Sequence, residues 1–179
     1  MNEMLGTDRY FLEKDRIPVF IGKKGIQKKQ FEEVFKCKLD INSNTGEVVV
    51  QDGEAIDNYV LSNIIHAINF GHSPESALEL RDENFVLDSI DVKMSVRDHK
   101  RLKVVMGRII GKEGGTRRLI EEITKCSVAV SEHMVSIIGP YENIMLVHEA
   151  LDMLINGSSH KSFYGFLERN RTKMDTGLM

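Results

Sequence analysis

Two short loops contain the residues of this sequence best suited to chemistry. Ile21-Gly22-Lys23-Lys24-Gly25 recurs as Ile110-Gly111-Lys112-Glu113-Gly114. Glycine at both ends of a loop permits tight backbone angles and lets a ligand approach the main chain without meeting a Cβ atom. A helix that begins at the second glycine presents free N–H groups and a positive dipole end, which favour a phosphate, and the lysines add charge. The two glycine loops, 22–25 and 111–114, therefore predict a phosphate-binding surface.

The Gly-x-x-Gly spacing is weak evidence by itself, because a chain with 14 glycines contains about one such spacing by chance. In the alternative interpretation the glycines only cap and turn a pair of helices. Three features favour binding: the loop is duplicated, a helix is expected on each side of it both times, and basic residues flank it. Bases would then lie along an apolar groove beside each loop, which suits single strands better than duplexes.

The loops belong to an internal repeat, which has to be recognised before single elements are assigned. At an offset of 89 residues four further pairs are identical: Glu32 and Glu121, Glu33 and Glu122, Lys36 and Lys125, Cys37 and Cys126. Farther along, at an offset of 86, Gly53 and Gly71 meet Gly139 and Gly157. The three extra residues of the first copy are expected in a turn at 42–46, since insertions are tolerated in turns.

Each copy predicts the same order of elements. The expected elements are a strand at 90–96 with a weaker counterpart at 9–15, a helix before each loop, a helix at 25–36 and again after 114, hairpins at 38–51 and 127–138, and a long amphipathic helix after Gly53 and after Gly139. The residues expected to face the core from the helices of the first copy are Ile26, Phe31, Val34, Phe35, Ile56, Val60, Ile64, Ala67 and Ile68.

The order βααββα with Ile-Gly-Lys-x-Gly between the first two helices resembles a type I KH domain. The tandem pair, the connector Ser-Pro-Glu-Ser-Ala-Leu and the tail His160–Arg171 resemble the archaeal Dim2/Pno1 ribosome assembly factors, which are related to Krr1. The resemblance implies an α+β fold with two type I KH domains packed in tandem and a short C-terminal helix. The expected segments are a first KH domain at 1–72, an acidic connector at 73–88, a second KH domain at 89–160 and a helical tail at 161–179.

The resemblance also implies a function. It implies an RNA-binding protein of ribosome biogenesis that binds small-subunit ribosomal RNA near its 3' end, on the pre-ribosomal small subunit. Expected protein partners are a Nob1-type endonuclease and, in archaea, translation initiation factor 2 alpha. One departure from the family pattern is Glu113, an acid in the second loop where basic or neutral residues are commoner.

Charge is unevenly distributed along the chain. The net charge of −3 argues against coating nucleic acid by bulk charge. The stretch 97–118, called the basic band below, nevertheless has eight Lys and Arg residues against two acids, whereas 75–91 has six acids and one arginine. The band surrounds the second loop and is the electrostatic pattern expected of an RNA-binding face, so we expect the second copy to supply most of the affinity.

The candidate RNA-binding residues are Ile21, Gly22, Lys23, Lys24, Gly25, Arg108, Ile110, Gly111, Lys112, Glu113, Gly114, Arg117 and Arg118. For Lys28, Lys29, Arg117 and Arg118 a solvated helix face is an equally good interpretation. The apolar residues Ile21, Ile26, Ile41, Ile110 and Val130 could line a groove for bases or belong to the core.

The tail allows two interpretations. Phe163, Phe166 and Leu167 lie on one helical face, and the tail also carries Arg169, Arg171 and Lys173. Either the tail docks on the second domain or it binds another protein.

Other chemistry is poorly supported. The pairs Glu32-Glu33 and Glu121-Glu122 cannot face one substrate, because adjacent helical residues diverge by about 100°, so we expect them to be surface charge. The cysteines and histidines have no metal-ligand spacing, and Cys37 and Cys126 are expected to pack as small hydrophobes. We therefore expect no cofactor, no metal and no enzyme activity.

No apolar run is long enough for a membrane span, and the first 14 residues are too polar for a secretory signal, so a cytoplasmic protein is expected. A tandem RNA-binding module is favoured over a KH scaffold for an initiation factor subunit or another RNA-processing partner. A phosphate-handling enzyme is the weakest alternative.

Overall fold

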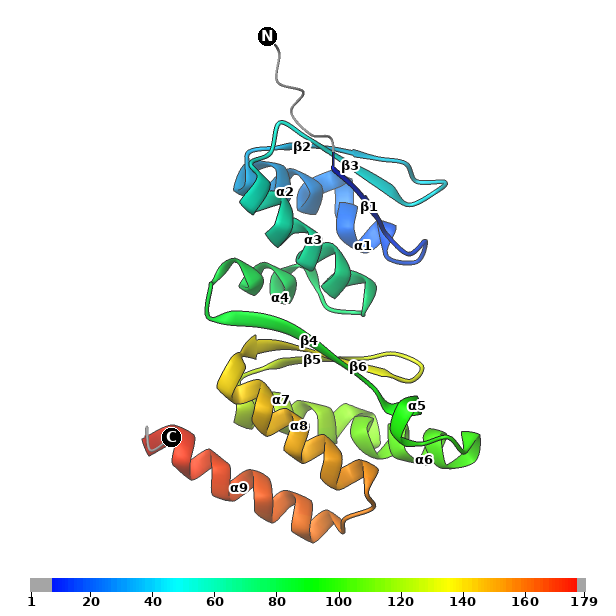
Figure 1. The fold of residues 1–179 in the computed structure, drawn as a ribbon, viewed down its shortest axis with the longest axis vertical. Coiled ribbons are helices and arrows are strands. Elements are labelled where there is room, and N and C mark those ends of the chain that lie inside the picture. The colour runs from blue at the N-terminus through cyan, green and yellow to red at the C-terminus, as the bar shows by residue number, and fades with distance from the viewer. Residues whose placement is uncertain (1–7, 177–179) are drawn as a thin grey trace. The chain divides into compact units, whose positions relative to one another are not determined.

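The computed structural model describes residues 8–176, and the side chains up to residue 171. The chain forms two compact units, one ending at Arg81 and the other beginning at Asp82 (Figure 1). The outer ends of the expected segments 1–72 and 161–179, and the side chain of Lys173, lie outside the described residues.

In the first unit the elements are β1 (Asp8–Phe11), α1 (Ile17–Ile21), α2 (Ile26–Phe35), β2 (Lys38–Ile41), β3 (Glu47–Gln51), α3 (Ala55–Asn69) and α4 (Pro74–Leu78). In the second unit they are β4 (Phe85–Asp91), α5 (Val92–Ser95), α6 (His99–Ile110), α7 (Gly115–Thr124), β5 (Ser127–Val130), β6 (Met134–Pro140), α8 (Tyr141–Ile155) and α9 (His160–Thr176). Single 3₁₀ turns at Lys23–Gly25 and Lys112–Gly114 form the glycine loops, and a third 3₁₀ turn follows α4 at Glu79–Arg81.

Each unit is built on a three-stranded antiparallel sheet. The strand order is β1-β3-β2 in the first unit and β4-β6-β5 in the second, so the second hairpin strand is central in both. Figure 1 shows the helices of each unit on one side of its sheet. This arrangement confirms the expected α+β fold, and both hairpins lie where the β-branched runs predict them.

The core of the first unit forms between its helices and sheet. Phe20 of α1 and Phe31 of α2 are fully buried and stack with ring centroids 4.7 Å apart, an arrangement that adds about 1 kcal/mol to the burial of the rings. Ile64, which was expected in this core, is also buried. Ile26 and Ile56 were wrongly expected there, since they are 60% and 72% exposed. Both lie in the first turn of their helices, and the buried faces begin farther along.

The strand expected at 90–96 is displaced toward the N-terminus. β4 begins at Phe85 and ends at Asp91, opposite Met134, the first residue of β6; beyond this pair the N–H of Val92 still donates to the carbonyl oxygen of His133, in the turn of the β5–β6 hairpin, and the strand pairing stops there. The chain turns into α5 instead, where the Asp91 carboxylate accepts a hydrogen bond from the N–H of Lys93. Val92 and Val96 are both buried at a spacing of four residues, which fits a helical turn as well as a strand.

The repeated cysteines and glycines are explained by packing. Cys37 and Cys126 are both buried, as expected. A Cβ atom at Gly53 would lie 3.4 Å from the Cβ of Cys37, and one at Gly139 would lie 2.5 Å from the Sγ of Cys126. Each cysteine therefore packs against the glycine that precedes the long helix of its own unit.

The repeat extends to the last helix of each unit, α4 in the first and α9 in the second. Ser73 caps α4 by accepting a hydrogen bond from the N–H of Ser76 at 3.2 Å, and Ser159 accepts one from the N–H of Ser162 at 3.1 Å. The two serine pairs are 86 residues apart, the offset of the preceding glycines. Part of the expected acidic connector is thus a capped helix of the first unit.

The last helix of each unit packs on the elements that precede it within the same unit. In the first unit Ala77 and Leu80 are buried. In the second unit Phe163, Phe166 and Leu167 of α9 join a core formed by α5 to α8 and the sheet. Of the two interpretations of the tail, the structure thus shows docking on the second unit. Among the described residues, no helix is long and apolar enough to cross a membrane.

Candidate nucleic-acid interface

The two glycine loops have the same backbone conformation. Gly22 has φ 72° and ψ 174°, and Gly111 has φ 74° and ψ 172°. At the second position of the x-x pair, Lys24 (φ 56°) and Glu113 (φ 51°) both adopt the left-handed region, which is uncommon for residues other than glycine. The backbone geometry is therefore repeated even where the side chains differ.

The first glycine of each loop is required by local packing. Its angles lie in a region of the Ramachandran map that is essentially restricted to glycine. A Cβ atom at Gly22 would lie 2.6 Å from the Cγ of Gln27, and one at Gly111 would lie 2.2 Å from the Oγ1 and 2.5 Å from the backbone nitrogen of Thr116. These glycines let α2 and α7 begin directly against the preceding turn.

The second glycine of each loop faces open space. A Cβ atom at Gly25, at Gly114 or at the following Gly115 would meet no atom within 4 Å. No described side chain caps the start of α2 or of α7, so the N-terminal N–H groups of these helices are not satisfied by a capping side chain. This side of each loop is open to a phosphate, and the helix dipole favours an anion there.

The loop lysines supply charge that is not neutralised within the protein. Lys23, Lys24 and Lys112 are exposed, and none of them forms an ion pair with a described residue. Glu113 is exposed beside Lys112 and offsets part of the charge of the second loop.

Three arginines of the basic band donate hydrogen bonds to backbone carbonyl oxygens of the second unit. Arg108 donates to the carbonyl oxygens of Leu154 and Ser158 at the end of α8. Arg101 donates to the carbonyl oxygen of Ile155, and Arg117 donates to that of Val128. Cations near a helix C-terminus stabilise its dipole, so Arg101 and Arg108 hold α6 against α8. The proposed RNA contacts of Arg108 and Arg117 stay predictions.

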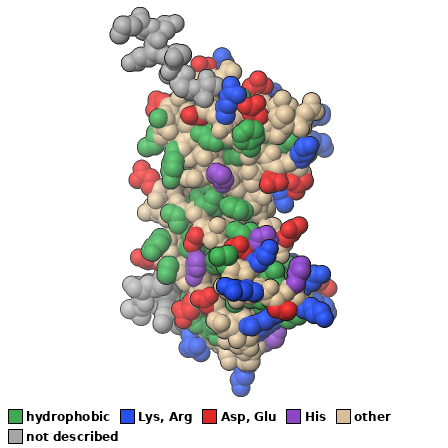
Figure 2. Space-filling model, turned by 45° about the vertical axis from the view of Figure 1, so that its right-hand side comes forward, with side chains coloured by type: hydrophobic (Ala, Val, Ile, Leu, Met, Phe, Trp, Pro, Cys, Tyr) green, Lys and Arg blue, Asp and Glu red, His purple; other side chains and the backbone are tan. Residues whose placement is uncertain are grey.

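Arg101 is nevertheless exposed, as are the other five cations of the band, and none of the six has a described ion-pair partner: Arg97, Lys100, Arg101, Lys103, Lys112 and Arg118. Figure 2 shows Lys and Arg side chains gathered over the second unit. The positive surface that surrounds the second loop is therefore smaller than the sequence count of the band implies.

The isoleucines beside the loops are partly exposed. Ile21 is half-buried, Ile110 is 39% exposed and Ile26 is 60% exposed. Ile26 lines a shallow surface cavity of about 390 Å³ together with Lys29, Gln30 and Glu33 of α2. Aliphatic side chains in such a position can pack against bases, so partial exposure favours the groove over the core for these residues.

Glu32 and Glu121 are not simple surface charges, contrary to the expectation. Each carboxylate accepts a hydrogen bond from a backbone N–H of the next strand, Leu39 at 3.0 Å and Val128 at 2.8 Å. Each also pairs with the cation four residues earlier in its helix, at 3.7 Å for Lys28 and 3.8 Å for Arg117. These glutamates therefore fix the helix that follows each loop to the edge of the sheet.

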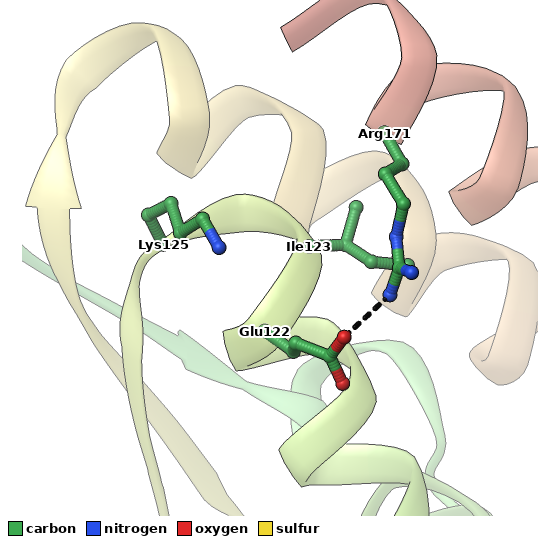
Figure 3. A pocket seen from close by; sticks show the side chains of 4 residues that line it. All are labelled: Glu122, Ile123, Lys125 and Arg171. Atoms are coloured by element: carbon green, nitrogen blue, oxygen red, sulfur yellow. Dashed lines mark hydrogen bonds and ion pairs between the residues drawn. The ribbon is translucent and has the colours of Figure 1, made fainter. Parts of the chain in front are cut away.

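Glu122, in contrast, links α7 to the tail helix. Its carboxylate lies 2.7 Å from the guanidinium of Arg171 on α9, and with Ile123 and Lys125 the pair lines a cavity of about 150 Å³ (Figure 3). Arg171 therefore helps to dock the tail. No group of His, Cys, Asp and Glu residues able to hold a metal ion is found within the described part of the chain.

Sequence reasoning missed Gln27 and Thr116, which pack against the first glycine of each loop, and Glu75, which hydrogen-bonds to Gln27. The position of Glu75 could have been predicted from the sequence. The serine pairs at 73–76 and 159–162 continue the repeat at the offset of 86, and they show that Glu75 belongs to a helix of the first unit.

Comparison with protein families and curated proteins finds KH-domain proteins. A family model described as eukaryotic type KH-domain (KH-domain type I) matches residues 86–172, which is the second unit with most of its tail helix. A KH domain-containing protein of Methanocaldococcus jannaschii is 37% identical over 167 residues, which are 91% of this chain and 73% of that protein. The RNA-binding protein pno1 of Dictyostelium discoideum is 27% identical, over 74% of this chain and 58% of its own length.

Solved structures agree with these matches. Dim2p from Pyrococcus horikoshii superposes with a TM-score of 0.80 at 38% identity, covering 92% of this chain and 99% of that one. The match in a complex of a/eIF2alpha, aDim2p and rRNA from the same organism has a TM-score of 0.82 at 38% identity, covering 96% of this chain and 97% of the other.

Proposed function

Because the chain belongs to the Pno1/Dim2 family of RNA-binding KH-domain proteins of ribosome biogenesis, we propose that it binds single-stranded small-subunit ribosomal RNA near the 3' end. Both units act as type I KH domains in this proposal, although the family model covers only the second. The protein then assists maturation of the small subunit in the cytoplasm as a binding protein without catalytic activity.

One observation carries the proposal: two loops of different sequence share one backbone geometry that leaves a helix N-terminus open. Gly22 and Gly111 hold the turn, while Gly25 and Gly114 leave space for a ligand. A dinucleotide step of RNA presents phosphates to these N–H groups, and its bases extend over the neighbouring isoleucines. The rRNA in the Pyrococcus horikoshii complex supports RNA as the ligand.

RNA binding is tested with substitutions in the loops of the full chain. Lys23→Asp with Lys24→Asp reverses the charge of the first loop, and Lys112→Asp reverses that of the second. Folding is expected to be preserved, because the three lysines are exposed and aspartate tolerates the left-handed conformation of Lys24. Affinity for a labelled single strand with the 3'-end sequence of small-subunit rRNA should fall, and the slope of log K against log salt should shrink by about 0.7 for each phosphate that the variant no longer neutralises.

Matched controls carry the same charge changes away from the loops. Lys36→Asp with Lys38→Asp is the control for the first-loop variant, because both residues are exposed and follow the C-terminal end of α2. Lys125→Asp serves the second in the same way at the end of α7. If the loop variants and their controls bind this RNA equally well, the loops are not the RNA site and the proposal fails.

A protein partner is a second candidate function, favoured by one observation. The Pyrococcus horikoshii complex contains a/eIF2alpha in addition to rRNA. We propose that this chain also contacts the alpha subunit of translation initiation factor 2, and on the pre-ribosomal small subunit a Nob1-type endonuclease. Size-exclusion chromatography of the purified proteins, with and without the RNA strand, tests each contact, and separate elution of a pair under both conditions would contradict it.

A further inference from the structure

The fourth helix of the first unit begins beside the first glycine loop. Gln27, in the first turn of α2, donates a hydrogen bond from its side-chain amide to the carboxylate of Glu75, in the first turn of α4, at 2.9 Å. The same glutamine packs against the loop, since a Cβ atom at Gly22 would lie 2.6 Å from its Cγ. A single side chain therefore separates the Glu75 carboxylate from the loop.

The Glu75 carboxylate is held in place and charged. Its own backbone N–H, the Ser73 hydroxyl and the Gln27 amide stabilise the ionised form and lower the pKa of Glu75 below its usual value. Ser73 is itself fixed as the cap of α4. Glu75 thus presents a negative charge near the first loop at neutral pH, in an orientation set by these hydrogen bonds.

The second unit has a cation at the equivalent position. At the offset that relates the two serine caps, Glu75 corresponds to Lys161, an exposed residue in the first turn of α9. At the offset that relates the two loops, Gln27 corresponds to Thr116, which is buried and is not bridged to α9 by any described hydrogen bond. The contact between a carboxylate and the loop glutamine is thus a feature of the first unit.

We propose that Glu75 weakens the first glycine loop as a phosphate site, so that the two loops of the chain hold RNA unequally. This inference rests on the proposed RNA binding. A fixed negative charge within about a Debye length, 8 Å at physiological ionic strength, raises the free energy of a phosphate held at the loop. Lys23 and Lys24 attract the same phosphate, and Glu75 offsets part of their attraction.

The magnitude follows from Coulomb's law. For a separation between carboxylate and phosphate of one Debye length, about 8 Å, in a water-like dielectric, removal of one charge changes affinity about twofold, and reversal of the charge changes it about fivefold. Glu75→Gln keeps an oxygen that can accept the Gln27 hydrogen bond, whereas Glu75→Lys places in the first unit the residue type found at 161. Both variants are therefore expected to bind RNA more tightly than the chain with Glu75, and Glu75→Lys more tightly than Glu75→Gln.

The experiment uses the full chain with Lys112→Asp as background, so that binding reports mainly on the first loop. Affinity for the labelled 3'-end single strand is measured for the background and for each Glu75 variant, at low and at high salt. The expected result is a gain of about twofold for Glu75→Gln and about fivefold for Glu75→Lys at low salt. The gain should shrink at high salt, because exposed charges are screened.

Glu54→Lys is the matched control, with the same change of net charge in the same unit. Glu54 is exposed and follows Gly53, which packs against Cys37 at the far end of α2 from the loop. It should therefore gain much less than Glu75→Lys. Equal gains for the two lysine variants, no gain at Glu75, or a gain that persists at high salt would overturn the inference. Absence of RNA binding by the unmodified chain would instead contradict the proposed function.

Discussion

The two glycines of one loop should differ sharply in what their replacement costs. In the second loop a Cβ atom at Gly111 would lie 2.2 Å from the side chain and 2.5 Å from the backbone nitrogen of Thr116, whereas one at Gly114 would meet nothing within 4 Å. Both residues have positive φ, but Gly111 has ψ 172° and Gly114 has ψ 13°. Only the second pair of angles lies in the left-handed region that other residues enter at modest cost.

The magnitudes follow from these geometries. Gly114→Ala incurs the left-handed penalty of about 1 kcal/mol, partly offset by the lower entropy of the unfolded chain. Gly111→Ala incurs a larger backbone penalty and adds an overlap that the helix backbone cannot relieve by a side-chain rotation, which by itself costs about 1 to 3 kcal/mol. We expect a total of about 3 kcal/mol or more for Gly111→Ala and less than about 1 kcal/mol for Gly114→Ala.

Urea unfolding of the full chain, monitored by far-UV circular dichroism, gives the loss of unfolding free energy for each variant. RNA affinity is measured in parallel, and Gly114→Ala should weaken it while leaving the protein folded, because its methyl group enters the open side of the loop. Similar stability losses for the two variants, or a greater loss at Gly114, would refute the division of the loop into a structural glycine and a binding glycine.

Three further expectations concern stability. Glu121→Ala should lower the free energy of urea unfolding by about 1 to 2 kcal/mol, because it leaves a strand N–H without its acceptor. Glu122→Ala removes only an exposed ion pair and should lower it by less than about 1 kcal/mol. Equal losses for the two variants would contradict the role of Glu121 in fixing α7 to the sheet. Phe163→Ala should cost about 3 to 5 kcal/mol and Tyr164→Ala much less, because the first ring is fully buried and the second is 41% exposed; a small loss for Phe163→Ala would show that tail docking contributes little. Burial, then nearby carboxylates, raise the pKa of the Cys37 thiol. At a pH above the usual thiol pKa, the unfolded chain has therefore released this proton while the folded state still holds it. The melting temperature should decrease as the pH rises through this range, and it should decrease less in Cys37→Ala.

The charged residues show how far sequence reasoning extends. Exposure of Lys23, Lys24 and Lys112 could be predicted, because a loop with glycine at both ends lies at the surface. The roles of Arg108 and Glu32 could not, because each depends on a backbone group that the chain brings near from another element. A count of charges along the chain treats such residues as available to a ligand, although they are hydrogen-bonded to backbone groups within the protein.

The strand before the second loop illustrates a conflict between two local patterns. Alternation from Ile90 to Val96 fits a strand of period two, while Val92 and Val96 also fit a helical turn. The position at which β6 begins opposite Asp91 decides between them, since a strand without a hydrogen-bonding neighbour leaves its N–H groups unsatisfied. No local pattern contains that information.

By itself the sequence determined the duplication, the order of the elements, both hairpins and the two glycine loops, because these depend on spacing and on glycine at defined positions. Tertiary structure alone decided which glycine of each loop is packed and which is open, which cations stay available to a phosphate, and that Glu75 lies one side chain away from the first loop. The physical reason is distance along the chain. Hydrogen-bond geometry and steric contact between residues far apart in sequence exist only once the helices have packed on their sheets.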